Sequence, residues 1–204
     1  MLNALRKFRV KRNQSMEITF LGYQKKLLAD FKKLDPQQLL FFSAWCCDHL
    51  FNQYKGEIDE RISSGVRQFV AECLNEIWNI VDNPSGIKKT VISNLLNNIK
   101  EMDIENELSP DETEDIAITK IVECIENTLR FALEKDQVMA VANAFLPIDV
   151  IDSILVNQYG IDTTDPDANI NHELFQKEFI AQDKLIHYLK EGNKPVSTEK
   201  NIFR

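Results

Sequence analysis

The sequence is poor in turn-forming residues and has no long apolar run. Its 204 residues include six glycines and six prolines, fewer than the roughly 7% and 5% of an average chain, and this predicts long regular elements. The longest apolar stretches, Leu39–Cys47 and Ala140–Leu146, fall short of the ~18 residues that a membrane span needs. Residues 1–15 lack the apolar core of a secretory signal. We therefore expect a cytoplasmic protein that does not cross a membrane.

Sequence motifs of catalysis and metal binding are also absent. There is no glycine-rich phosphate loop, Gly-x-Ser-x-Gly elbow or His-Glu-x-x-His. Residues 46–49 (Cys-Cys-Asp-His) are consecutive, and consecutive side chains on a helix point in different directions, so they cannot converge on one ion. The stretch from Asp165 resembles the opening of a calcium-binding EF-hand loop, but Ile170 stands where that loop requires glycine. We expect no catalytic site, no metal and no cofactor.

Cysteine usage agrees with a reducing compartment. The four cysteines, Cys46, Cys47, Cys73 and Cys124, all lie in apolar, helix-like stretches. Free cysteine behaves as a small apolar residue and is among the most buried residue types. We therefore predict reduced, buried thiols rather than disulfides.

Apolar residues recur at three-and-four spacing along most of the chain, which predicts helices. The expected helices cover residues 16–34, 36–54, about 62–81, 85–102, 109–135, 136–159 and 171–191. No strand pattern with a two-residue period is present. The sequence thus predicts an all-α fold, an antiparallel bundle of about seven helices, as a single domain over residues 16–191. Residues 1–15 are expected to form a flexible basic leader and residues 192–204 a flexible tail.

Several residues are typical of helix ends or breaks. Asp35 followed by Pro36 predicts an N-cap and a first-turn proline. Ser109, with Pro110 and Glu112 after it, is typical of a capping box. Pro147 is expected to kink or split the sixth helix, because it removes one hydrogen bond of the helix ladder. Gly160 is expected to end that helix.

Charge is unevenly distributed along the chain. The net charge is −8, but residues 1–33 hold nine basic and two acidic residues, which leaves 15 basic and 30 acidic residues for positions 34–204. Such a body repels nucleic acid and membrane headgroups and attracts basic partners. The basic leader could contact phosphate, but the preferred interpretation is a solvated leader, for which Met16 is an alternative start.

Two acidic runs stand out in the body, and neither contains a basic residue. The first comprises Glu101, Asp103, Glu105, Glu107, Asp111, Glu112, Glu114 and Asp115. The second extends from Asp136 to Glu173 and includes Asp162, Asp165 and Asp167. Carboxylates are common on solvated faces and at helix N-termini, where they suit the helix dipole. The alternative is a contact surface for a basic protein partner.

Three segments carry a family resemblance. Residues 39–59 (LLFFSAWCCDHLFNQYKGEID), 75–81 (NEIWNIV) and 165–185 (DPDANINHELFQKEFIAQDKL) resemble bacterial domain-of-unknown-function family 416, the YjaG-like proteins. The likeness spans residues 16–191. It implies an all-helical bacterial cytoplasmic protein, of a kind found among immunity proteins that are paired with secreted or contact-delivered toxins, many of them nucleases.

The first functional hypothesis is therefore an immunity protein of contact-dependent growth inhibition. It would bind a cognate toxin, a nuclease domain, by stoichiometric occlusion through the acidic runs, and it would not itself be an enzyme. The alternative is a helical scaffold protein unrelated to toxins, which could form a homodimer through an apolar helix face. An enzyme is the third hypothesis, with Asp48 and His49 as the first residues to mutate. The acidic body argues against nucleic acid and membrane as partners.

Overall fold

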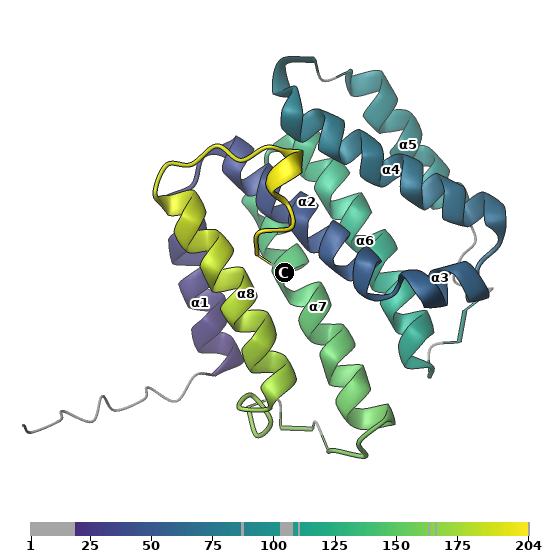
Figure 1. Cartoon of the computed structure of the whole chain (residues 1–204), viewed down its shortest axis with the longest axis vertical. Helices are drawn as coiled ribbons and strands as arrows, with labels where there is room; N and C mark the ends of the chain where they lie inside the picture. Colours follow the sequence, from purple (N-terminus) through teal and green to yellow (C-terminus); the bar gives the residue numbers. More distant parts are fainter. Residues whose placement is uncertain are drawn as a thin grey trace, which may run out of the picture.

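The computed structural model describes residues 19–86, 88–102, 108–109, 111–162, 164–165 and 167–203. Every regular element in this part of the chain is helical, so the predicted all-α, single-domain fold is confirmed (Figure 1). The elements are α1 (Phe20–Phe31), α2 (Pro36–Gln53), α3 (Lys55–Arg61), α4 (Ser64–Asp82), η1 (Pro84–Gly86), α5 (Lys89–Glu101), α6 (Thr113–Glu134), α7 (Gln137–Asn157), α8 (Glu173–Lys190) and η3 (Ser197–Glu199). The predicted leader of residues 1–15 lies outside the described residues.

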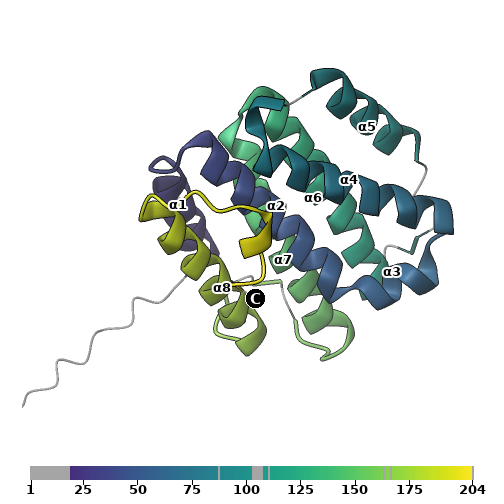
Figure 2. The same cartoon turned by 45° about the horizontal axis from the view of Figure 1, so that its top comes forward.

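Helix α2 is the central element of the domain. It begins at the predicted N-cap, Asp35, whose side chain accepts from the Gln37 and Gln38 backbone N–H groups. Gln38 reaches back to the Asp35 N–H, which completes a capping box that was not predicted. Its apolar middle packs against α4, α6, α7 and α8, and the side chains of Phe42 and Trp45 are fully buried. Figure 2 shows α2 crossing the molecule between α8 and α4. A helix that is apolar on nearly every side requires this kind of enclosure.

Contacts between side chains give the relative directions of the helices. Helices α6 and α7 form an antiparallel hairpin, and α2 runs antiparallel to α8, because Gln38 donates to the Leu189 carbonyl while His49 contacts Glu178. Helix α1 is parallel to α8, since Phe20 packs on Phe175 near their starts and Asp30 pairs with Lys190 near their ends. The bundle is therefore not antiparallel throughout.

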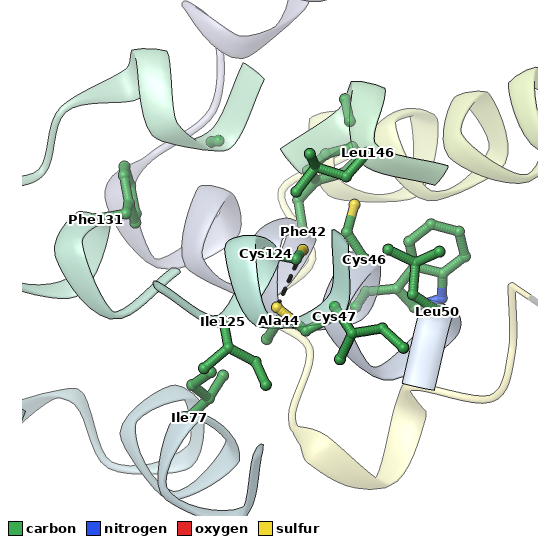
Figure 3. Packing of buried hydrophobic residues seen from close by; sticks show 14 of the residues in the cluster. Phe42, Ala44, Cys46, Cys47, Leu50, Ile77, Cys124, Ile125, Phe131 and Leu146 are labelled. Atoms are coloured by element: carbon green, nitrogen blue, oxygen red, sulfur yellow. Dashed lines mark hydrogen bonds between the residues drawn. The ribbon is translucent and has the colours of Figure 1, made fainter. Parts of the chain in front are cut away.

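The core contains all four cysteines, which are free and buried as predicted. Figure 3 shows Cys47 of α2 facing Cys124 of α6, with their sulfur atoms 3.2 Å apart. Thr128 and Asn143 complete this buried cluster, because the Asn143 amide donates to Thr128 Oγ1 at 2.8 Å and Thr128 Oγ1 donates to the Cys124 carbonyl at 2.8 Å. The cluster joins the three helices with the largest shared interfaces, α2, α6 and α7.

Helix α7 passes through Pro147 and ends at Asn157. Pro147 is buried within the helix, which continues through it with buried residues on both sides and packs against α2 and α6, so the proline does not split α7. Gly160 follows with φ of +64°, as the predicted stop requires. By length and composition, α7 is also the one described helix that could cross a membrane, but 56% of its apolar window is buried inside the domain. The core helix of a soluble bundle passes the same test.

Two expected helix boundaries are corrected. Helix α6 begins at Thr113 rather than Ser109, because Ser109 closes a separate turn by accepting from the Asp111 N–H. An eighth helix, α3, forms at Lys55–Arg61, between the helices that were expected over residues 36–54 and 62–81.

The segment 192–203 is packed against the domain and is not a flexible tail. The Ser197 backbone N–H and hydroxyl donate to the Asp82 carboxylate at 2.7 and 2.5 Å. Phe203 is buried against Tyr188, with 5.1 Å between the ring centroids. Figure 1 shows this segment crossing the front of the bundle over α2.

Candidate partner-binding surface

The structure describes most of the acidic residues that the sequence singles out. Glu101 is the last residue of α5. Asp111, Glu112, Glu114 and Asp115 lie at the start of α6, and Asp162, Asp165 and Asp167 lie in the connection between α7 and α8. Asp103, Glu105 and Glu107 lie outside the described residues.

The two acidic runs meet at one end of the bundle. The Asn157 side-chain amide, at the C-terminal end of α7, donates to the Asp111 carbonyl at 3.1 Å and to Thr113 Oγ1 at 3.2 Å. These bonds hold the start of α6 beside the end of α7, from which the chain continues directly into the loop that contains Asp162. Figure 1 shows both segments at the lower end of the molecule. We call this region, residues 111–114 and 156–167 among those described, the acidic end.

Arg61 of α3 neutralises part of the first run. Its guanidinium donates to Asp115 at 2.9 Å, forms an ion pair with Glu112, and lies 3.7 Å from Glu114. The bonds to Glu112 and Asp115 raise the pKa of Arg61 above its usual value. The second oxygen of Asp115 accepts from the Ser109 N–H at 2.7 Å, and Asp115 is only 6% exposed. Asp115 therefore anchors the start of α6, and we no longer include it among the residues expected to contact a partner.

The acids of the second run shape their own loop. Asp162 accepts from the Thr164 N–H at 2.9 Å, and this bond lowers the pKa of Asp162. Asp165 accepts from the Asp167 N–H at 3.1 Å. Asp167 accepts from the Phe20 N–H at 2.8 Å, which ties the first residue of α1 to the loop. All three acids remain on the surface, so the loop presents a fixed set of negative charges.

Two apolar side chains of the acidic end are exposed. Tyr159 is 60% exposed and Val156 is 43% exposed. The Tyr159 ring packs edge-on against His172, with ring centroids 5.8 Å apart, so the ring is held at the surface. Tyrosine is enriched at protein interfaces and among the residues that dominate binding energy.

Sequence reasoning gave these two apolar residues no role. Val156 lies in the last turn of α7, and Tyr159 follows the end of that helix at Asn157. Whether these side chains are covered depends on how α7 packs against its neighbours, so their exposure could be seen only in the structure.

His49, one of the two residues of the enzyme hypothesis, belongs to an internal network. His49 Nε2 lies 3.1 Å from Glu178 Oε2, and the second oxygen of Glu178 accepts from the Gln182 amide at 2.7 Å. Gln182 in turn accepts from the Tyr23 hydroxyl at 2.9 Å and donates to the Ala144 carbonyl at 2.8 Å. This chain joins α1, α2, α7 and α8 and satisfies its members within the bundle, so we interpret it as structural.

The described residues contain no group of three or more His, Cys, Asp or Glu side chains placed to hold a metal ion. Comparison of the chain with models of known protein families, with curated proteins and with solved structures finds no match. The resemblance to the YjaG-like proteins stays a prediction from the segments that carry it. The geometry and charge of the surface are therefore the observations that bear on function.

Proposed function

We propose that this protein binds a basic protein partner through the acidic end, and that it acts as an immunity protein that occludes a toxin domain, a nuclease. The observation that carries the proposal is the bond pair from Asn157, which brings two acidic segments together around the exposed Tyr159. The proposed binding is stoichiometric and involves no chemistry. The cytoplasm is the proposed location, because an immunity protein has to meet the toxin there.

The anatomy of the acidic end suits such a partner. An interface commonly combines an apolar centre with a polar rim. Here Tyr159 and Val156 supply the centre, and the exposed Asp111, Asp162 and Asp165 supply the rim. Surface charges of this kind raise the association rate and specificity more than the final affinity. A nuclease site is shaped to attract a polyanion, so an acidic surface would be steered toward it.

The test uses variants that remove charge and keep the loop. In the triple variant Asp111→Asn, Asp162→Asn and Asp165→Asn, the side-chain oxygens that accept from Thr164 and Asp167 are retained. The matched control is Glu72→Gln, Glu134→Gln and Glu191→Gln, which removes the same charge from exposed positions away from the acidic end. Immobilised wild-type protein is used to capture proteins from the source cells, and the captured chain is identified by mass spectrometry.

We expect a basic chain whose expression alone stops growth and whose co-expression with this protein does not. The acidic-end variant should associate about tenfold more slowly with that chain at low salt, whereas the control should match the wild type. Equal association rates for the two variants would contradict the proposed surface. A captured chain that is harmless to cells would contradict the immunity role and favour the scaffold.

A further inference from the structure

A second acidic site lies away from the acidic end, between α2 and α4. Its centre is Asp48, which is 4% exposed. The Trp78 indole N–H and the Lys200 ammonium donate to Asp48 Oδ1 at 3.2 and 3.1 Å, and the Asn52 amide donates to Oδ2 at 3.1 Å. A cavity of about 180 Å³ opens beside these groups. It is lined by Asp48, Phe51, Asn52, Ala71, Leu74, Asn75, Trp78 and Lys200.

The chemistry of this site is that of a cation receptor. Lys200 Nζ lies 5.2 Å from the centre of the Trp78 ring while it pairs with Asp48. An aromatic face and a carboxylate that bind the same ammonium recognise a cation in two ways, by the ring quadrupole and by charge. The carboxylate is held in place by Trp78 and Asn52, so its position does not depend on Lys200.

The cation that occupies the site belongs to a peripheral segment. Residues 191–203 are attached by polar contacts, among them Ser197 with Asp82 and the Tyr188 hydroxyl with Glu199, and by the buried ring of Phe203. Lys200 itself is 31% exposed at its side chain. The chain therefore holds one of its own lysines as an internal ligand in a site with remaining space beside it.

We propose that the Asp48–Trp78 site binds a lysine or arginine side chain of a protein partner, and that Lys200 is the internal competitor which that side chain displaces. The segment 191–203 then acts as a clasp over the site. This inference goes beyond the proposed function, because the site shares no residue with the acidic end. A partner that inserts a basic side chain here would have to displace the clasp, so the clasp lowers the affinity of the site for that partner.

The effect of Lys200 on the binding of a free lysine side chain can be estimated. A tethered group reaches an effective concentration in the millimolar range or above, and a free ligand has to exceed it. Removing the Lys200 ammonium should therefore strengthen binding of a free lysine side chain by about tenfold. Lys200→Met removes the charge and keeps an unbranched apolar side chain that is one heavy atom shorter.

The matched control is Lys194→Met, because Lys194 is an exposed lysine of the same segment. Lys200→Arg keeps the cation and should behave as the wild type. Far-UV circular dichroism confirms that each variant is folded before it is titrated.

The probe is Nα-acetyl-lysine methylamide, and the neutral norleucine analogue serves as its control. Binding is followed by the indole N–H signals in nitrogen–proton correlation spectra, of which the two tryptophans give two. The Trp78 indole donates to Asp48 and should report the ligand, and Trp45→Phe assigns the signals. We expect a saturable shift of the Trp78 signal in Lys200→Met at about tenfold lower probe concentration than in Lys194→Met.

Two results would overturn the inference. One is that the lysine probe does not shift the Trp78 signal of Lys200→Met, or that the norleucine analogue shifts it by the same amount. The other is equal binding by Lys200→Met and Lys194→Met, which would show that Lys200 does not compete. Asp48→Asn in the Lys200→Met background should abolish the response, and a surviving response would assign it to another site.

Discussion

The two tryptophans test how the core is stabilised. Their burial and their hydrogen bonding predict opposite orders for the loss of unfolding free energy when each is replaced by phenylalanine. Trp45 is 0% exposed and Trp78 is 7% exposed. The Trp45 indole N–H has no hydrogen-bond partner among the described residues. The Trp78 indole N–H donates to the buried carboxylate of Asp48 at 3.2 Å. Replacing each by phenylalanine removes the same atoms from both sites.

The magnitudes favour hydrogen bonding as the deciding term. Each replacement removes two buried ring carbons, which costs about 1.6 kcal/mol at roughly 0.8 kcal/mol per buried carbon. At Trp45 the change also removes an unpartnered buried donor, which restores about 1 to 3 kcal/mol. Trp45→Phe should therefore change the free energy of unfolding by no more than about 1.5 kcal/mol in either direction. At Trp78 the same replacement removes a hydrogen bond to a charged acceptor, so Trp78→Phe should lower the free energy of unfolding by about 3 to 5 kcal/mol in total.

Urea denaturation followed by far-UV circular dichroism measures both values without depending on tryptophan fluorescence. The slope of the unfolding free energy against urea should be the same in the wild type and both variants, so that midpoints can be compared directly. Trp78→Phe should unfold at the lower urea concentration. If Trp45→Phe is instead the more destabilised variant, burial alone sets the cost, and the hydrogen-bond argument fails for both sites.

Two further predictions concern titratable groups. The Asp30 carboxylate is partly desolvated, but hydrogen bonds from Lys190 and Lys33 outweigh this and lower its pKa. Its contribution to stability is present above the usual aspartate pKa of about 3.9 and is lost as the pH falls through the lowered value. Asp30→Asn should thus lower the urea midpoint near neutral pH and have little effect near about pH 2; an equal effect at both would exclude the charge as the cause. Burial raises the pKa of Cys73 to about 12 and raises that of Cys124 well above its usual value, so native thiols should react with Ellman's reagent only as fast as the protein unfolds, and rapid labelling in native buffer would contradict this enclosure.

Helix boundaries that depend on one or two neighbouring residues could be predicted from the sequence. Asp35 and Pro36 set the start of α2 through local bonds alone. Gly160 ends the α7 segment because it accepts a positive φ. At Ser109 the same reasoning placed the start of α6 too early, because the cap competes with a tertiary contact. The carboxylate of Asp115, which is held by Arg61, captures the Ser109 N–H.

The packed C-terminal segment could not be predicted in this way. Residues 192–203 contain few apolar residues, and their partners come from distant parts of the chain. Asp82 binds Ser197 and Asp48 binds Lys200. Contacts of this kind leave no periodic pattern of residues in the sequence, so sequence analysis predicts a flexible tail.

The candidate surface shows the same division between local and distant information. The sequence located the negative charge, but the effective charge of the acidic end also depends on Arg61, which precedes the acids by two α-helices, α4 and α5, and pairs with Glu112, Glu114 and Asp115. One guanidinium offsets one of these three negative charges, and Asp115 is buried, so the start of α6 steers a basic partner less strongly than its number of acids suggests. We therefore expect each charge of Asp111 and the loop acids, unpaired among the described residues, to contribute more to binding than each acid that pairs with Arg61.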